Sequence, residues 1–170
     1  MARVSPSQRY FACEDQISDL RKPKSWLHGA VINTLGDTFC YTTRSKRRHQ
    51  RYNILPTHLY NLWGESIKSG TEKPGSILPY IRACAHPSEL RSWFVPILME
   101  HHWYLLAFDW VDCKIHAYDS FSVSGPPLSP LIEFGMAFVC IVYEDFGLKT
   151  PDWEFHPEKV CGFFLVSGFV

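Results

Sequence analysis

The sequence predicts an α+β fold, because helix-forming regions stand on both sides of a central block of short strands. Apolar residues recur at helical spacing from Trp26 onward. Three short runs between Trp93 and Tyr118 are rich in aromatic and β-branched residues, which is typical of antiparallel strands joined by tight turns. A mostly apolar stretch follows at Leu131–Tyr143. With 170 residues, 46% of them apolar and 15% aromatic, we expect one domain with a well-packed core.

Composition excludes several classes of protein. The 17 Lys and Arg residues balance 17 Asp and Glu, so the whole surface has no net charge to attract nucleic acid or an acidic membrane. The six cysteines are unevenly spaced and none forms a zinc-binding pair, so we expect no structural metal site. The first thirty residues lack an apolar signal core, and no apolar run reaches the ~20 residues that cross a bilayer. We expect reduced thiols, no membrane partner, and an intracellular protein of the nucleus or cytoplasm.

The N-terminal part predicts a polar arm and two helices. Residues 1–24 are polar and broken by prolines, so we expect an arm with one short helical piece around Asp15–Arg21. The apolar positions after Trp26 predict a helix with these residues on its buried face: Leu27, Ala30, Val31, Leu35 and Phe39. A second helix is predicted over His58–Ile67, and it ends before Gly70.

A basic run separates these two helices. Arg44–Arg51 holds five Lys or Arg in eight residues without apolar periodicity, which predicts a loop or a frayed helix end. Two interpretations remain open, a solvated loop and a local nucleic-acid or nuclear-address patch. Nucleic acid is therefore expected as a partner only through this run.

The centre of the chain predicts three antiparallel strands. They are Trp93–Met99, His102–Trp110 and Lys114–Tyr118, joined by turns at Glu100-His101 and at 111–113.

Prolines interrupt the chain after these strands. Pro126, Pro127 and Pro130 precede Leu131–Tyr143, which is either a helix or another buried segment. A short extended piece is predicted at Trp153–Phe155.

The candidate chemistry rests on a cysteine, a histidine and an aspartate. His102 begins one predicted strand and Asp119 follows the next, so a hairpin would bring both to one rim of the sheet. Cys161 would open a final helix, whose N-terminal N–H groups favour a thiolate. A thiol hydrolase needs this set, which is a nucleophile, a base and an acceptor that orients the base. Taken singly, each residue also has an ordinary structural explanation, as core thiol, solvated imidazole or cap.

The local motifs resemble one known family. The segment 94–109 contains Val-Pro-Ile, His-Trp and a hydrophobic strand that ends in Asp, and Tyr118-Asp119-Ser120 follows. Trp26-Leu27 with Val31-Ile32-Asn33, and Cys161-Gly-Phe-Phe, occur in the same order. This pattern is similar to that of the ubiquitin-like-protease family, the SUMO-deconjugating cysteine peptidases, and covers the chain from Trp26 to its end.

The resemblance implies a function and a fold, and it implies no metal and no cofactor. The fold would be papain-like, with the nucleophile at a helix N-terminus facing a small sheet, and residues 25–170 would form the catalytic domain after an arm at 1–24. His102 would be the general base, Asp119 the residue that orients it, and Cys161 the nucleophile of a peptidase that cleaves after the terminal Gly-Gly of SUMO or a related modifier. Trp26 and Trp103 would flank a substrate tunnel that only a diglycine tail can enter.

Several positions depart from the family pattern. The family's oxyanion Gln, six residues before the nucleophile, is replaced by Phe155, and no Gln follows Gln50. The oxyanion hole is therefore unassigned, with His156 and Lys159 as the nearby side-chain donors and the Cys161 N–H as one backbone arm. His28-Gly29 stands where the family often has Asn-Asp. The segment before Cys161 is short, and the chain ends nine residues after it, so we expect a C-terminally truncated domain.

Three hypotheses follow from these matches and departures. The first is an active cysteine isopeptidase that removes a ubiquitin-like modifier. The second is a pseudo-enzyme that binds such a modifier without cleaving it. The third is a fragment or an incomplete reading frame. The identity of the modifier, and the choice between precursor processing and deconjugation, stay open.

Overall fold

The computed structural model describes residues 12–19, 27–45, 52–70, 75–84, 86, 91–119 and 128–158. In chain order the elements are α1 (Glu14–Asp19), α2 (Gly29–Ser45), β1 (Tyr52–Ile54), α3 (Leu59–Lys68), α4 (Leu78–Ala83), β2 (Ser92–Met99), β3 (His102–Asp109), β4 (Lys114–Asp119), α5 (Leu128–Asp145) and β5 (Glu154–Glu158). The helices and strands confirm the predicted α+β class. No described helix has the length and apolar character that crossing a bilayer requires.

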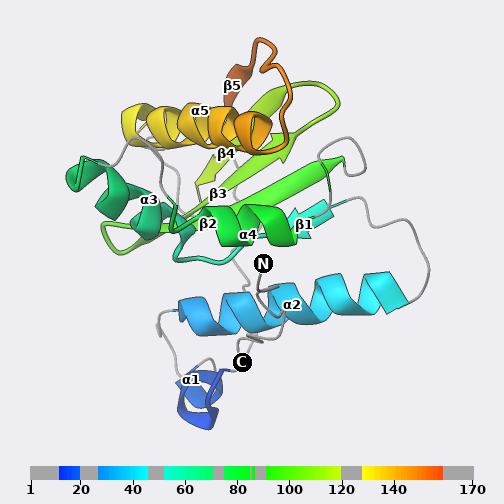
Figure 1. Ribbon diagram of the computed structural model, residues 1–170. Coiled ribbons are helices and arrows are strands. Elements are labelled where there is room, and N and C mark those ends of the chain that lie inside the picture. The colour runs from blue at the N-terminus through cyan, green and yellow to red at the C-terminus, as the bar shows by residue number, and fades with distance from the viewer. Residues whose placement is uncertain are drawn as a thin grey trace.

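The sheet has five strands in the order β1-β2-β3-β4-β5 (Figure 1). The two central pairings, β2 with β3 and β3 with β4, are antiparallel, as predicted. The edge strands β1 and β5 pair in parallel with β2 and β4. Glu100 and His101 make the β2–β3 turn with φ of 51° and 62°, the left-handed pair that a two-residue hairpin requires. This tight turn makes His102 the first residue of β3.

The core lies between the sheet and α5, which runs along one face of it (Figure 1). Gly135 of α5 lets the helix approach closely, because a Cβ there would lie 3.2 Å from the Ile115 side chain of β4. Aromatic rings fill this layer, including these buried residues of the sheet and α5: Trp93, Phe108, Phe134 and Phe138. Leu59 of α3 and Ile81 of α4 are buried in the same cluster.

Helix α2 packs on the sheet through a face that the apolar pattern did not indicate. Leu35, predicted to be buried, is 63% exposed. Val31 is buried as predicted, but the other inward positions are Gly29, Asn33 and Gly36, which share one face at spacings of four and three residues. Gly36 meets the side chain of Ile54 in β1, and Asn33 Oδ1 accepts a hydrogen bond of 2.9 Å from the Thr57 N–H. Small residues allow this close approach, so the predicted buried face was wrong at Leu35 and at Leu27, which is 39% exposed, and was confirmed at Val31.

Other boundaries confirm or extend the sequence predictions. Helices α1 and α3 lie where they were predicted, and Gly70 follows α3 with φ of 68°. Helix α5 begins before Pro130, which stands in the first turn where its missing N–H costs nothing. The strand β1 and the helix α4 were not predicted. The basic run lies outside the described residues apart from Arg44 and Ser45, which end α2.

Candidate functional site

Two of the predicted catalytic residues lie side by side at one end of the β3–β4 hairpin. His102 is the first residue of β3 and Asp119 is the last residue of β4. In the antiparallel register Tyr104 is opposite Asp119, so both chain ends reach the same rim of the sheet. His102 Nε2 lies 2.5 Å from Asp119 Oδ1. The juxtaposition predicted from the hairpin is confirmed.

The His102–Asp119 pair is arranged for proton transfer. Asp119 is 5% exposed, whereas the His102 side chain is 25% exposed and reaches the surface. A buried carboxylate that accepts from Nε2–H selects the tautomer whose lone pair is on Nδ1. In that tautomer the nitrogen that can accept a proton is Nδ1, while Asp119 holds Nε2–H.

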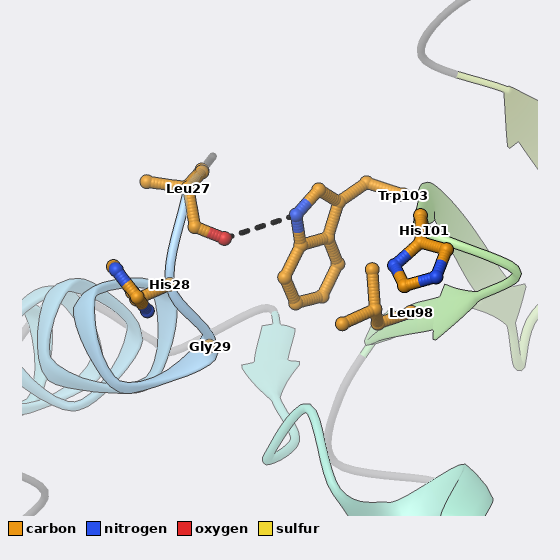
Figure 2. A pocket seen from close by; sticks show the side chains of 6 residues that line it. All are labelled: Leu27, His28, Gly29, Leu98, His101 and Trp103. Atoms are coloured by element: carbon orange, nitrogen blue, oxygen red, sulfur yellow. Dashed lines mark hydrogen bonds between the residues drawn. The ribbon is translucent and has the colours of Figure 1, made fainter. Parts of the chain in front are cut away.

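Trp103 lies on the opposite face of β3 from His102, because successive strand residues alternate. Its Nε1–H donates a 3.1 Å hydrogen bond to the carbonyl oxygen of Leu27, so β3 contacts the segment that leads into α2. Figure 2 shows the indole between Leu27 and Leu98. These residues line a pocket of about 210 Å³: Leu27, His28, Gly29, Leu98, His101 and Trp103.

The second predicted tunnel residue, Trp26, lies outside the described residues, although its neighbour Leu27 contacts Trp103. Sequence analysis did not assign Leu98 or His101 to this site. The two-residue turn could have indicated that Leu98 belongs to the site, because this turn pairs Leu98 with Trp103 across the hairpin. His101 belongs to the turn itself and stands two positions before Trp103, on the same side.

Gly29 controls how closely α2 approaches this pocket. A Cβ at position 29 would lie 2.7 Å from Thr57 Oγ1 and 3.7 Å from the Trp103 ring. The acidic residue that the related motif often has at this position would not fit in the present arrangement. The glycine that departs from the family motif at position 29 therefore fits the close packing of this position against Thr57 and Trp103.

We expect Gly29→Ala to destabilise the protein by about 1–3 kcal/mol, because the added methyl must push Thr57 or α2 aside. The matched control is Gly64→Ala in α3, where nothing lies within 4 Å of the new Cβ. There the change should stabilise by about 0.5–1 kcal/mol through helix propensity. Urea unfolding of both variants measures the difference, and equal stability would contradict the close packing at Gly29.

Phe155, at the position expected for the oxyanion Gln, lies within β5. It pairs with Ile115, four residues before Asp119, which places it about 13 Å along the sheet from the level of Asp119. Its partly buried side chain packs against the core cluster. Position 155, six residues before Cys161, therefore lies in a strand with its side chain against the core. This placement explains why the residue there is apolar.

His156 faces away from the His102–Asp119 pair. It pairs with His116 in the parallel register, and the two rings stack with centroids 5.5 Å apart. Its Nε2 lies 3.0 Å from Glu154 Oε2. As placed, His156 is not directed at the candidate active site. Lys159 and Cys161 lie outside the described residues, as does the helix expected to begin at Cys161.

No known family profile matches the sequence. No curated protein matches it significantly either. Solved structures do share the fold. The SUMO protease Ulp1, with its catalytic cysteine oxidised to a sulfinic acid, is similar with a TM-score of 0.65 at 18% identity over 92% of this chain and 68% of that chain. A de-sumoylating protease is similar with a TM-score of 0.64 at 11% identity over 86% of this chain and 58% of that chain.

A third similar structure is the C-terminal Ulp1 protease domain in complex with Smt3, the yeast ortholog of SUMO. Its TM-score is 0.59 at 19% identity, over 84% of this chain and 60% of that chain. This chain thus spans between 58% and 68% of the length of the three solved chains. It has the papain-like α+β fold of Ulp1-like SUMO proteases, as the sequence motifs predicted.

Proposed function

We propose that this protein is a cysteine peptidase that cleaves after the C-terminal Gly-Gly of SUMO or a related ubiquitin-like modifier. The hydrogen-bonded His102–Asp119 pair, at the rim of a sheet with the fold of SUMO proteases, carries the proposal. The fold by itself supports only the architecture. The pair adds a base and its orienting carboxylate, which are two of the three groups that thiol hydrolysis needs.

In the proposed reaction, His102 accepts and returns one proton in each of two half-reactions, the formation and the hydrolysis of a thioester. Nδ1 accepts the proton of the Cys161 thiol, while Nε2–H stays hydrogen-bonded to Asp119. The thiolate attacks the carbonyl carbon of the terminal glycine, and the oxyanion collapses to a thioester as the leaving amine takes the proton from Nδ1. Water then gives a proton to Nδ1 and attacks the thioester, which releases the glycine carboxylate and restores the thiol.

Strand β5 supports Cys161 as the nucleophile. Tyr118 pairs with Glu158, so β5 ends beside the last two residues of β4. Cys161 follows Glu158 by three residues, and three residues span at most about 10 Å. Adjacent strands are about 4.8 Å apart, so this length is sufficient to bring position 161 to the rim that carries Asp119 and His102.

Trp103 supports a diglycine tail as the substrate group. Its indole is held by Leu27, the neighbour of Trp26, so that two aromatic residues would border the entrance. A narrow passage between ring faces admits glycine, which has no Cβ, and excludes larger residues. The modifier is proposed as partner on this ground, and the complex of Ulp1 with Smt3 is a precedent in the same fold.

A modifier whose tail ends in a vinyl sulfone tests the proposal directly. The probe should form one covalent adduct, at Cys161, which mass spectrometry of the digested protein would locate. Cys161→Ala should abolish the adduct. Cys140→Ala, which removes an exposed thiol of α5, should leave it unchanged. Folded protein that forms no adduct would refute an active peptidase.

A modifier-binding protein without catalysis is the second candidate, and Phe155 favours it. Loss of one oxyanion donor typically lowers the rate about 100- to 1000-fold. This candidate predicts measurable binding of SUMO by calorimetry, equal for wild type and Cys161→Ala, with no turnover. Absence of binding would exclude it.

A further inference from the structure

Tyr104 contacts the catalytic candidate His102 on the face that Asp119 also occupies. It stands two residues after His102 on β3 and directly opposite Asp119 on β4. The Tyr104 and His102 ring centroids are 5.0 Å apart, with the planes inclined by 55°. Tyr104 is buried in the core cluster, whereas His102 reaches the surface. The tyrosine therefore forms a fixed wall beside a partly exposed imidazole.

The hydrogen bond to Asp119 does not by itself fix the plane of the His102 imidazole. The second side-chain torsion of histidine is broad and roughly two-fold, so the ring can turn about the Nε2–Asp119 contact, or flip so that ring carbons take the places of the nitrogens. Asp119 defines the direction of Nε2 but not the plane of the ring. A large, buried ring against the imidazole removes that remaining freedom.

The charge state of Tyr104 suits this role. Burial raises the pKa of its hydroxyl, and the negative charges of Asp119 and Glu100 raise it further. Since the pKa lies above the usual value of 10.0, the side chain stays neutral wherever a Cys–His pair is reactive. It can therefore pack against His102 without adding a charge that would compete with Asp119.

We propose that Tyr104 is the positioning residue for His102, holding the imidazole with Nε2 on Asp119 and Nδ1 turned away from that carboxylate. The catalytic consequence rests on the proposed peptidase function, but the ring orientation does not. No chemical step is assigned to the tyrosine hydroxyl. The aromatic ring performs the role, so phenylalanine should replace it and an aliphatic residue should not.

The test reads the tautomer of His102 by long-range ¹H–¹⁵N NMR in the full chain, with His102→Gln identifying its signals. Wild type and Tyr104→Phe should show one Nε2–H tautomer. Tyr104→Leu should show averaged nitrogen shifts for His102. Tyr118→Leu, a tyrosine of β4 on the opposite face that stacks on His116, is the matched control and should resemble wild type. A single, unchanged His102 tautomer in Tyr104→Leu would overturn the proposal.

Two further measurements keep the test decisive. In the wild-type protein, Tyr104 ring protons should show nuclear Overhauser effects to the His102 ring, and their absence would overturn the proposal even if Tyr104→Leu does not fold. With an active enzyme, Tyr104→Leu should lower kcat about tenfold with KM unchanged, and Tyr104→Phe should restore it. An inactive protein with the expected tautomers would refute the peptidase function and leave the positioning role intact.

Discussion

Replacing His102 with alanine should lower the turnover of a SUMO-type substrate by about 10⁴-fold. The loss is large because one imidazole serves twice in the proposed reaction, first taking the thiol proton and then giving it to the leaving amine. Asp119→Asn should also reduce kcat, because an amide no longer selects the tautomer that acts through Nδ1. Release of the modifier from a C-terminal fluorogenic amide measures both effects.

His116→Gln is the matched control for His102. His116 is also hydrogen-bonded to a carboxylate, with Nδ1 2.7 Å from Glu158 Oε1, but it lies on the opposite face of the sheet. It should retain turnover within a factor of two or so of wild type. If His102→Ala kept more than a tenth of the activity, or if both histidines mattered equally, His102 would not be the base.

Phe138→Ala should destabilise the fold by about 3–5 kcal/mol. Phe138 is fully buried, and its ring contacts three others, with centroid distances of 5.0 Å to Phe108, 5.7 Å to Phe134 and 6.2 Å to Trp93. Truncation removes apolar burial and leaves a cavity between α5 and the sheet. Such a loss is a large share of the 5–15 kcal/mol that domains typically have.

Ile132→Ala on the same helix is the control for this core substitution. Ile132 is 37% exposed, so its truncation should cost about 1 kcal/mol or less. Urea unfolding monitored by circular dichroism compares the two variants. A loss below about 1 kcal/mol for Phe138→Ala would mean that the aromatic layer does not hold α5 on the sheet.

The sequence by itself determined the local parts of this protein. Short runs of aromatic and β-branched residues, joined by tight turns, predicted β2, β3 and β4. They also predicted that His102 and Asp119 meet at one rim, because a hairpin's register depends only on its turn and its own residues. The sequence likewise predicted α3, whereas it left the stretch that forms α5 open between a helix and another buried segment. The motifs that contain these residues pointed to the fold that the solved SUMO proteases share.

The tertiary structure alone decided what depends on distant contacts. The parallel pairing of β5 with β4 placed Phe155 in the core, and no local signal indicates the register of a parallel strand. The face of α2 was decided by its fit against Thr57 and Ile54, where glycines pack closer than leucines could. The strand β1 has three residues, too few to show a pattern, and it depends on its pairing with β2 and on the contact of its Ile54 with α2.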